Sequence, residues 1–274
     1  MADFFIGGSP RSGTTLMQAV LAADETANPV MGESTNFSAL VDAYVHGKYQ
    51  FEKSVGDFFP DPDALREFYA DTARRYLDVV RERTGAQHLV LKDPNLTPRL
   101  AEVHDLLPEA RFVVITRHPF DVIASMIRVG KRLQEMGEWS PFDHRDVGKM
   151  CVQYLGCYGP LAEAQEKSKT FQQALFWVRY EDLVTDADTV LEGIGKFTGL
   201  DCRKFDPSGE WRMFSSLALA ANKRQEAFPT KLSGRGISKD SVGKFRDVLS
   251  ADDCQLIEKE CREAITAFGY DRNP

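Results

Sequence analysis

Four short runs of apolar residues divide the sequence, and turn-forming, polar or charged residues follow each of them. The runs are Phe4–Ile6, His88–Leu91, Arg111–Thr116 and Ala174–Val178. Short runs rich in β-branched and aromatic side chains, with turn residues at their ends, predict buried β-strands. Because stretches with helical spacing separate the runs, the pattern predicts parallel strands joined by crossover helices.

Helical spacing and helix-start signals describe the segments between and after these strands. A helix is expected from about Thr14 to Ala23, and another from Asp61-Pro62 to about Arg83. The pair Thr97-Pro98 predicts a further helix start, with threonine as the cap and proline in the first turn. Ser250 through Asp253 is typical of a capping box before a last helix near Cys254–Phe268.

Two segments carry glycine, proline and charge without clear periodicity, namely Leu133–Phe142 and Ala220–Gly243. We interpret both as loops, of the mobile kind that often lies beside a functional site. The sequence contains no internal repeat, low-complexity tract or long linker. It therefore predicts one α/β domain over residues 1–274, with a central, mostly parallel β-sheet flanked by helices.

The composition argues against some classes of protein. The chain of 274 residues is 43% hydrophobic and 27% charged, which is ordinary for a soluble globular protein. Its formal net charge of −7 argues against a nucleic-acid binder, which would carry a basic surplus. Any anion site must therefore be a local concentration of positive charge within an acidic protein.

Five cysteines without a CxxC pair predict neither a zinc site nor a disulfide framework, so a reducing compartment is the simpler interpretation. A strand-like segment starts within a few residues of Met1, and no apolar run approaches the length of a membrane span. We therefore expect a cytoplasmic location, with no signal peptide or transmembrane segment. No cluster of Asp, Glu and His suggests a metal site, so no metal is expected.

The strongest chemical signal lies between the first predicted strand and the first predicted helix. It is the segment Gly8-Ser9-Pro10-Arg11-Ser12-Gly13-Thr14-Thr15. Glycines permit a tight turn in which successive backbone N–H groups point inward, and the helix N-terminus adds partial positive charge. The segment therefore predicts a phosphate cradle, against the alternative that a Gly/Ser/Pro-rich stretch is only a turn.

This cradle differs from the loop of nucleoside triphosphatases at one position. Where the pattern G-x-x-x-x-G-K-[ST] requires lysine, this chain has Thr14, and its cation stands earlier, at Arg11. A loop without that lysine is poorly suited to ATP hydrolysis. An arginine within the turn still suits an anion that carries a transferable group at its end.

The segment from Phe5 to Met17 resembles the 5′-phosphosulfate loop of sulfotransferases, particularly that of the tyrosylprotein sulfotransferase branch. Leu91-Lys92-Asp93-Pro94 is similar to the Lys-Asp-Pro turn of the same branch. Arg117-His118-Pro119, with Asp121 and Ser125 in the helix after it, resembles the family's 3′-phosphate site.

Two later blocks complete the resemblance. Tyr180 matches a strand-end tyrosine of the family, and Val242-Gly243-Lys244-Phe245-Arg246 resembles its late basic loop, with Phe where Trp is common. The blocks follow the family's order and extend from residue 4 to about residue 246. The resemblance implies a sulfotransferase fold of the P-loop NTPase type. It also implies the co-substrate 3′-phosphoadenosine 5′-phosphosulfate (PAPS), which leaves as adenosine 3′,5′-bisphosphate (PAP).

The resemblance also implies donor contacts. Residues 9–15 would bind the 5′ side of the donor, and further contacts would come from Arg117, Ser125, Tyr180, Lys244 and Arg246. The residues themselves support part of this, because a phosphate could bridge Arg117 at a strand end and Ser125 on the next helix. Taken singly, Arg117 could equally form a surface ion pair, and Ser125 could be a helix-packing residue.

Three residues are expected to carry the chemistry. Arg11 and Lys92 would stabilise charge on the transferring and leaving groups. Glu33 matches the glutamate that serves as base in tyrosylprotein sulfotransferases. From its position alone, Glu33 could instead be an ordinary carboxylate at a helix start. His104 and His118 are the rival bases, with His104 expected to be structural and His118 better placed to bind than to abstract a proton.

The sequence therefore predicts a PAPS-dependent sulfotransferase that acts on an acceptor hydroxyl, without a nucleic-acid partner. The acceptor is left open among a small molecule, a lipid, a carbohydrate and a tyrosine or other phenol, and the oligomeric state is also open. One alternative is a P-loop kinase or nucleoside triphosphatase, which Thr14 opposes. Another is an inactive nucleotide-binding protein on the same fold, which would need none of Arg11, Lys92 and Glu33.

Overall fold

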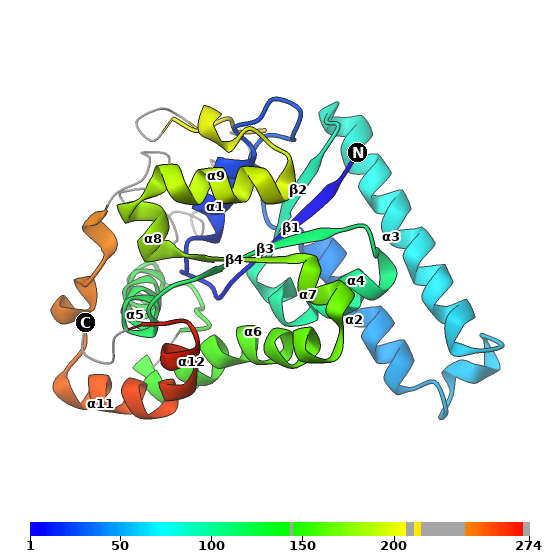
Figure 1. Cartoon of the computed structure of the whole chain (residues 1–274). Coiled ribbons are helices and arrows are strands. Elements are labelled where there is room, and N and C mark those ends of the chain that lie inside the picture. Colours follow the sequence, from blue (N-terminus) through cyan, green and yellow to red (C-terminus); the bar gives the residue numbers. More distant parts are fainter. Residues whose placement is uncertain (143–144, 207–210, 215–238, 271–274) are drawn as a thin grey trace.

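Four parallel strands form the centre of the computed structural model, in the order β2-β1-β3-β4 (Figure 1). The strands are β1 (Asp3–Gly7), β2 (Leu89–Lys92), β3 (Arg111–Thr116) and β4 (Leu175–Arg179). The structure describes residues 1–142, 145–206, 211–214 and 239–270. Each strand agrees with its predicted run to within one residue at either end, so the expected parallel sheet is confirmed.

Helices connect the strands and cover the sheet. The α-helices of the described residues are α1 (Thr14–Leu21), α2 (Thr35–Tyr49), α3 (Pro62–Thr84), α4 (Leu100–Leu106), α5 (Pro119–Glu135), α6 (Val147–Lys167), α7 (Lys169–Gln173), α8 (Tyr180–Thr185), α9 (Ala187–Thr198), α11 (Ala251–Glu260) and α12 (Arg262–Ala267). The short 3₁₀ helices are η1 (Val55–Asp57), η2 (Pro94–Arg99), η4 (Cys202–Lys204), η6 (Lys239–Ser241) and η7 (Lys244–Asp247).

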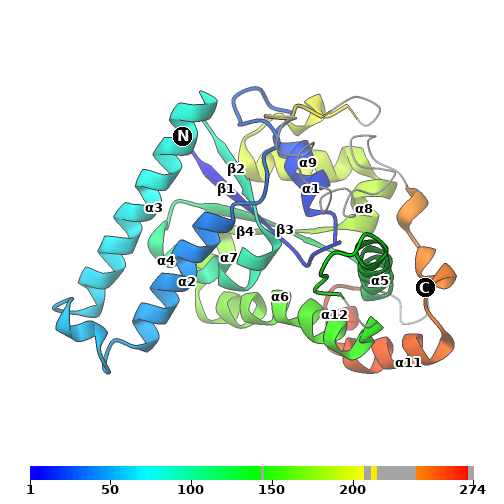
Figure 2. The same cartoon turned by 180° about the vertical axis from the view of Figure 1, so that it is seen from behind.

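The two faces of the sheet bury two separate sets of apolar side chains. Along β1, Phe4 and Ile6 pack with α1, α8 and α9, whereas Phe5 points to the opposite face. That opposite face carries α2 to α7 together with α11 and α12, and Figure 2 shows the same layers from behind. A strand that is covered on both faces is apolar at every position, which explains the continuous apolar runs of the sequence.

Most of the predicted helices are confirmed. Asp61 caps α3 by accepting a hydrogen bond from the N–H of Ala64, and Pro62 occupies the first helical position. The capping box of Ser250 and Asp253 is present at the start of α11. The expected last helix is in fact two helices, because the backbone leaves the helical conformation at Cys261.

The predicted helix start at Thr97-Pro98 is wrong. The helical path begins at Pro94, because the carboxylate of Asp93 accepts the N–H of Asn95 and caps η2. The hydroxyl of Thr97 is used elsewhere, since it accepts a hydrogen bond from the N–H of Gly8 at 2.9 Å. A hydroxyl engaged in a tertiary contact is not available as a cap, and the earlier aspartate takes that role.

The structure describes one of the two predicted loops completely and the other only in part. Of Leu133–Phe142, the first residues belong to α5, which continues to Glu135 before Gly137 turns with a φ of 72°. The first part of Ala220–Gly243, residues 220–238, lies outside the described residues, and residues 239–241 form η6. In the described part of the chain, no helix combines the length and apolar character needed to cross a membrane.

The turn after α1 is held by one buried carboxylate, Asp24. It accepts hydrogen bonds from the N–H and hydroxyl of Thr26 at 2.9 and 2.6 Å, and from the N–H of Asp201 at 2.8 Å. Burial acts to raise the pKa of Asp24, but these hydrogen bonds outweigh it and lower the pKa to about 2.

We expect Asp24→Asn to lower the free energy of unfolding at pH 7 by roughly 2 kcal/mol. The folded pKa lies below the ordinary value, so this stabilisation is present above about pH 4 and is lost as the pH falls toward 2. Urea unfolding at several pH values should therefore show the two proteins converging in acid. Asp71→Asn, on the exposed side of α3, is the control and should show no such convergence. A difference that stays constant down to pH 2.5 would contradict the assignment.

Candidate functional site

The predicted site residues follow the carboxyl ends of the strands, which meet at one edge of the parallel sheet. The helices that follow the neighbouring strands β1 and β3 lie on opposite faces of the sheet, with α1 on one face and α5 on the other. In open parallel sheets, a crevice at such a switch point is where ligands bind. Lys92 ends β2, and Arg179 ends β4 directly before Tyr180. The topology therefore gathers the loops after all four strands at this edge.

The loop between β1 and α1 has a backbone that side chains would obstruct. A Cβ atom on Gly8, where φ is 148°, would lie 2.6 Å from the carbonyl oxygen of Ile115. On Gly13, where φ is 107°, it would lie 2.8 Å from the ring of Tyr180. Arg11 itself adopts a left-handed φ of 74°. Such a conformation in a non-glycine residue costs of order 1 kcal/mol and persists only where neighbours impose it.

Two buried side chains from distant elements clamp this loop. Thr97 accepts the N–H of Gly8 and donates its hydroxyl to the carbonyl oxygen of Gly8 at 3.1 Å. Tyr158 on α6 accepts the N–H of Ser9 and donates to the carbonyl of Ile115, both at 3.0 Å. Neither was recognised from the sequence, because nothing local distinguishes Thr97 from a helix cap or Tyr158 from a packing residue.

The loop leads into the N-terminus of α1, with Gly13 as the N-cap residue. By helix geometry, the N–H groups of Thr14 and Thr15 have no acceptor within the helix. They add to the positive end of the helix dipole, so this end of α1 suits an anion. Ser12 closes the turn by donating its hydroxyl to the carbonyl of Ser9 at 2.7 Å.

Arg11 joins the loops that follow β1 and β3. Its Nε donates to the hydroxyl of Ser125 on α5 at 3.2 Å, and its carbonyl accepts from Nη1 of Arg117 at 3.3 Å. Partial burial, with the like charges of Arg132 and Arg117, lowers the pKa of Arg11 to about 10, while Glu33 acts in the opposite direction. Guanidinium groups that repel one another in this way favour an anion between them.

Lys92 and Glu33 form an ion pair, with 2.9 Å between Nζ and Oε1. The lysine side chain is only 7% exposed, whereas that of Glu33 is 44% exposed. The main chains are also joined, because the N–H of Ser34 donates to the carbonyl of Lys92 at 3.0 Å. Because Ser34 is the N-cap residue of α2, Glu33 lies before the helix, and its carboxylate pairs with Lys92.

Arg117 lies against the ring of Tyr180, with 4.6 Å between its guanidinium carbon and the ring centroid. Its Nη2 donates to the main-chain oxygen of Ser241, and the hydroxyls of Ser241 and Tyr180 are 2.5 Å apart. The main-chain oxygen of Ser241 thus accepts a hydrogen bond from Arg117 that an oxygen of a bound anion could accept instead. Ser241 was not among the predicted site residues.

Asp121, in the first turn of α5, anchors the segment that contains Ser241. Its two carboxylate oxygens accept the N–H groups of Gly243 at 2.8 Å and Phe245 at 3.0 Å. The side chains of Lys244 and Arg246 are exposed, and the guanidinium of Arg246 lies over the ring of Phe245 at 4.7 Å. The structure therefore brings this segment to Arg117 through Ser241, while the two predicted cations lie on its outer side.

The two histidines have structural contacts. His118 is 5% exposed, and its Nδ1 accepts the N–H of Phe120 as the cap of α5. His104 on α4 packs its ring against Phe112 and Phe171. Burial is the main reason that the pKa of His104 is lowered.

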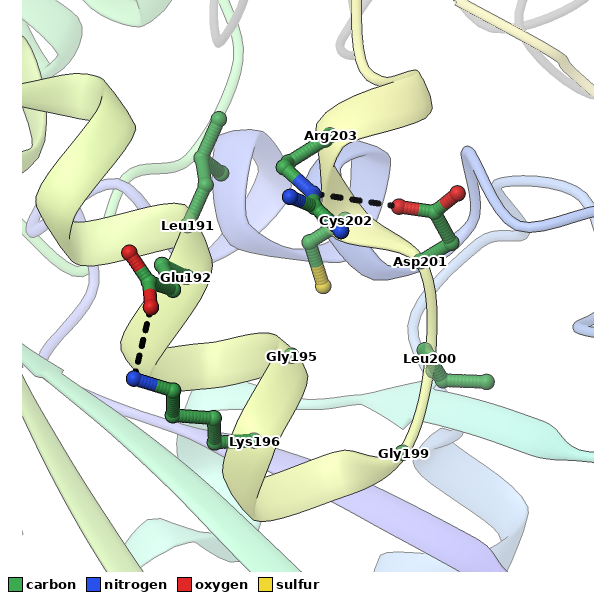
Figure 3. Close-up of a pocket in the computed structure, with 9 residues that line it drawn as sticks. All are labelled: Leu191, Glu192, Gly195, Lys196, Gly199, Leu200, Asp201, Cys202 and Arg203. Atoms are coloured by element: carbon green, nitrogen blue, oxygen red, sulfur yellow. Dashed lines mark ion pairs between the residues drawn. The ribbon is translucent and has the colours of Figure 1, made fainter.

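A surface hollow of about 350 Å³ lies elsewhere, between α9 and η4 (Figure 3). Its charges are paired locally, because Glu192 lies 2.6 Å from Lys196 and Asp201 lies 3.7 Å from Arg203. Burial raises the pKa of the Cys202 thiol to about 12, so the thiol stays protonated and unreactive at neutral pH. We assign no role to this hollow.

Comparison with known proteins gives a family. A sequence model described as "Sulfotransferase family" matches residues 3–204. Omega-hydroxy-beta-dihydromenaquinone-9 sulfotransferase Stf3 of Mycobacterium bovis is 27% identical over 68% of this chain and 47% of its own length. Carbohydrate sulfotransferase 2 of Mus musculus is 27% identical over 68% of this chain and 34% of its own length. The chain thus covers less than half the length of either relative.

A solved sulfotransferase domain from the curacin biosynthetic pathway has a similar fold. It superposes with a TM-score of 0.64 at 17% identity and covers 98% of both chains. The predicted α/β fold of the sulfotransferase type is therefore confirmed.

We expect Gly8→Ala to destabilise the protein by about 2 kcal/mol or more. The added Cβ would meet a main-chain oxygen that cannot move aside, in a backbone conformation that alanine disfavours. Gly32→Ala is the control, since nothing lies within 4 Å of a Cβ added there. Thermal unfolding of the two variants should separate them clearly, and equal melting temperatures would show that the loop relaxes without cost.

Proposed function

Because this chain belongs to the sulfotransferase family, we propose that it transfers a sulfuryl group from PAPS to an acceptor hydroxyl. The observation that carries the proposal is the Lys92–Glu33 ion pair, whose carboxylate acts on the charge of Arg11. A buried cation, a half-exposed carboxylate and the arginine of an anion loop are the groups that sulfuryl transfer requires.

The residues at the strand ends fit a donor with two separate phosphate groups. The 5′ side would occupy the cradle of Ser9, Pro10, Arg11, Ser12, Gly13, Thr14 and Thr15. The absence of a Cβ at Gly8 and Gly13 lets this loop lie close to Ile115 and Tyr180. The 3′-phosphate would take the position of the Ser241 oxygen on Arg117, near Ser125 and beside the ring of Tyr180. Lys244 and Arg246 belong to the segment that would then move.

We propose a direct, in-line displacement. The acceptor oxygen forms a bond to sulfur while the bond from sulfur to the 5′-phosphate oxygen breaks, and PAP leaves. Glu33 takes the proton of the acceptor hydroxyl, and Arg11 and Lys92 stabilise the charge on the transferring and leaving groups. A sulfuryl group carries less charge than a phosphoryl group, so we propose that these side-chain cations act without a metal ion.

The acceptor is proposed to be a hydroxyl-bearing compound. The two relatives are named for a menaquinone and for carbohydrates, which supports lipid and carbohydrate hydroxyls among the four candidate classes, beside small molecules and tyrosine. A screen of these four classes, read as the mass gain of one sulfuryl group, would identify the acceptor. An inactive nucleotide-binding protein would bind PAP and modify none of them.

The cellular setting is likewise proposed. All five cysteines are free thiols, which supports a reducing, cytoplasmic location without a disulfide framework. The acidic net charge supports the absence of a nucleic-acid partner. The core residues of the described part lie on the two faces of one sheet, which supports a single domain over residues 1–274.

PAP should stabilise the protein against thermal unfolding much more than ATP does. Arg117→Ala should weaken PAP binding by about 10- to 100-fold, because it removes a charged partner of the 3′-phosphate. Isothermal titration of PAP and ATP would measure both effects. Arg203→Ala, an exposed arginine beside the hollow of Figure 3, is the control and should bind PAP normally. Equal affinity for ATP and PAP would exclude a dedicated 3′-phosphate site.

Glu33→Gln should reduce turnover by roughly 10²- to 10⁴-fold, because the amide cannot take a proton. Donor affinity should stay nearly unchanged, because the amide oxygen can still accept the hydrogen bond from Lys92. Arg11→Ala should lower both turnover and donor affinity, since Arg11 would contact the donor before and during transfer. Steady-state kinetics with an identified acceptor, combined with PAP titration, separates the two patterns.

Glu25→Gln is the matched control for Glu33→Gln, because Glu25 is an exposed carboxylate earlier in the same stretch of chain. It should keep normal turnover. Near-normal turnover in Glu33→Gln as well would reject Glu33 as the base, and attention would return to His118 and His104.

A further inference from the structure

The segment that carries Glu33 runs along the outer edge of β2, which is an edge strand of the sheet. At its start, the side-chain oxygen of Asn28 accepts the N–H of Val90 at 2.6 Å. At its end, the N–H of Ser34 donates to the carbonyl of Lys92 at 3.0 Å. These contacts hold the two ends of the segment, and Glu33 lies just before the second.

The middle of the segment is held from its other side by residues 211–214. The N–H of Val30 donates to the carbonyl of Arg212 at 2.8 Å, and the carbonyl of Val30 accepts the N–H of Phe214 at 3.0 Å. Val30 and Met213 thereby form an isolated parallel bridge. The position of Val30, three residues before Glu33, therefore depends on a part of the chain nearly two hundred residues away.

The side chain of Arg212 fixes that bridge to the end of α1. Its Nε donates to the carbonyl of Ala22 at 3.2 Å, and its Nη2 donates to the carbonyls of Asp24 at 3.0 Å and Ala27 at 2.5 Å. Ala22 is the C-cap residue of α1, and carbonyls at a helix C-terminus attract positive charge. A guanidinium presents five N–H donors in a planar fork, which can bond several carbonyls with a spacing that the single nitrogen of lysine does not reproduce.

We propose that Arg212 is a positioning residue for Glu33. Its side chain locks residues 211–214 to α1, the bridge transmits this position to Val30, and Glu33 is thereby held where it meets Lys92. A Cβ added to Gly32, between Val30 and Glu33, would meet no atom within 4 Å, so nothing packs against that side of the chain. Arg212 lies beyond residues 3–204, the part that the family match covers. As a statement about catalysis, this inference depends on the function proposed above.

The test compares Arg212→Ala and Arg212→Lys with a matched control, Arg111→Ala. Arg111 also donates to a helix-end carbonyl, that of Phe197 at the end of α9, without contacting the Glu33 segment. We expect Arg212→Ala to reduce turnover about 10- to 100-fold, because small displacements of a catalytic group have effects of that size. PAP affinity should stay within about threefold of wild type, since the variant leaves the donor loops intact.

Arg212→Lys should lose less turnover than Arg212→Ala, because it keeps the charge without the planar fork. Arg111→Ala should keep wild-type turnover. The inference is overturned if Arg212→Ala keeps wild-type turnover, or if Arg111→Ala loses as much. Because Arg212 lies at the surface, its replacement should leave the core folded. If Arg212→Ala nevertheless fails to fold, Arg212→Lys carries the test.

Hydrogen exchange gives a second readout that requires no sulfuryl transfer. In both Arg212 variants, peptides covering residues 28–34 should exchange faster than in wild type, with no change in β1 or α5. Unchanged exchange in residues 28–34 overturns the inference whatever the activity. If the wild-type protein transfers sulfuryl groups to no acceptor, the proposed function fails, and the exchange data still decide whether Arg212 positions this segment.

Discussion

The turn between β1 and α1 has no room for a side chain at Gly8 or Gly13, and the rest of the site is arranged around that restriction. Gly8 runs so close to β3 that a Cβ would touch the carbonyl of Ile115. The close approach allows Thr97 and Tyr158 to hold Gly8 and Ser9 by their main-chain groups. A turn held in this position places the N-terminus of α1 and the side chain of Arg11 at the same crevice.

Positive charge is the second constraint on this crevice. Burial and the like charges of Arg132 and Arg117 lower the pKa of Arg11, in a chain whose net charge is −7. Asp121 offsets part of the repulsion, at 3.8 Å from Arg117, and also anchors Gly243 and Phe245. An anion in the crevice would relieve the remaining repulsion, which supports a donor with two phosphate groups. Because the chain as a whole is acidic, it would not attract other polyanions, such as nucleic acids, elsewhere on its surface.

The ion pair of Lys92 and Glu33 connects this crevice to a second part of the chain. Lys92 is almost fully buried, so its charge needs a partner, and Glu33 supplies one while remaining half-exposed. Glu33 belongs to no helix or strand, and its position is set by contacts with β2 on one side and residues 211–214 on the other. A carboxylate held in this way can meet a solvent-borne acceptor and still face a buried cation.

The sequence by itself determined the four strands, most of the helices and the loop around Arg11. These features depend on local physics, namely which residues favour a buried strand, begin a helix or permit a left-handed turn. Arg117 and Ser125 were predicted to share a phosphate, because one stands at a strand end and the other on the following helix. In the structure each of them bonds to Arg11. The helix start at Thr97 was mispredicted, since the hydroxyl that would cap a helix is bonded to Gly8, 89 residues away.

Only the tertiary structure decided how these pieces meet. Tyr158 reaches Ser9 across 149 positions of sequence, and Ser241 reaches Arg117 across 124. Contacts of that length leave no periodicity or spacing in the sequence, because they depend on how helices pack against the sheet. The pairing of Glu33 with Lys92, and the support that Arg212 lends to it, are of the same kind. The local pattern therefore specified the glycine-containing loop between β1 and α1, and the packing of distant segments determined which side chains surround it.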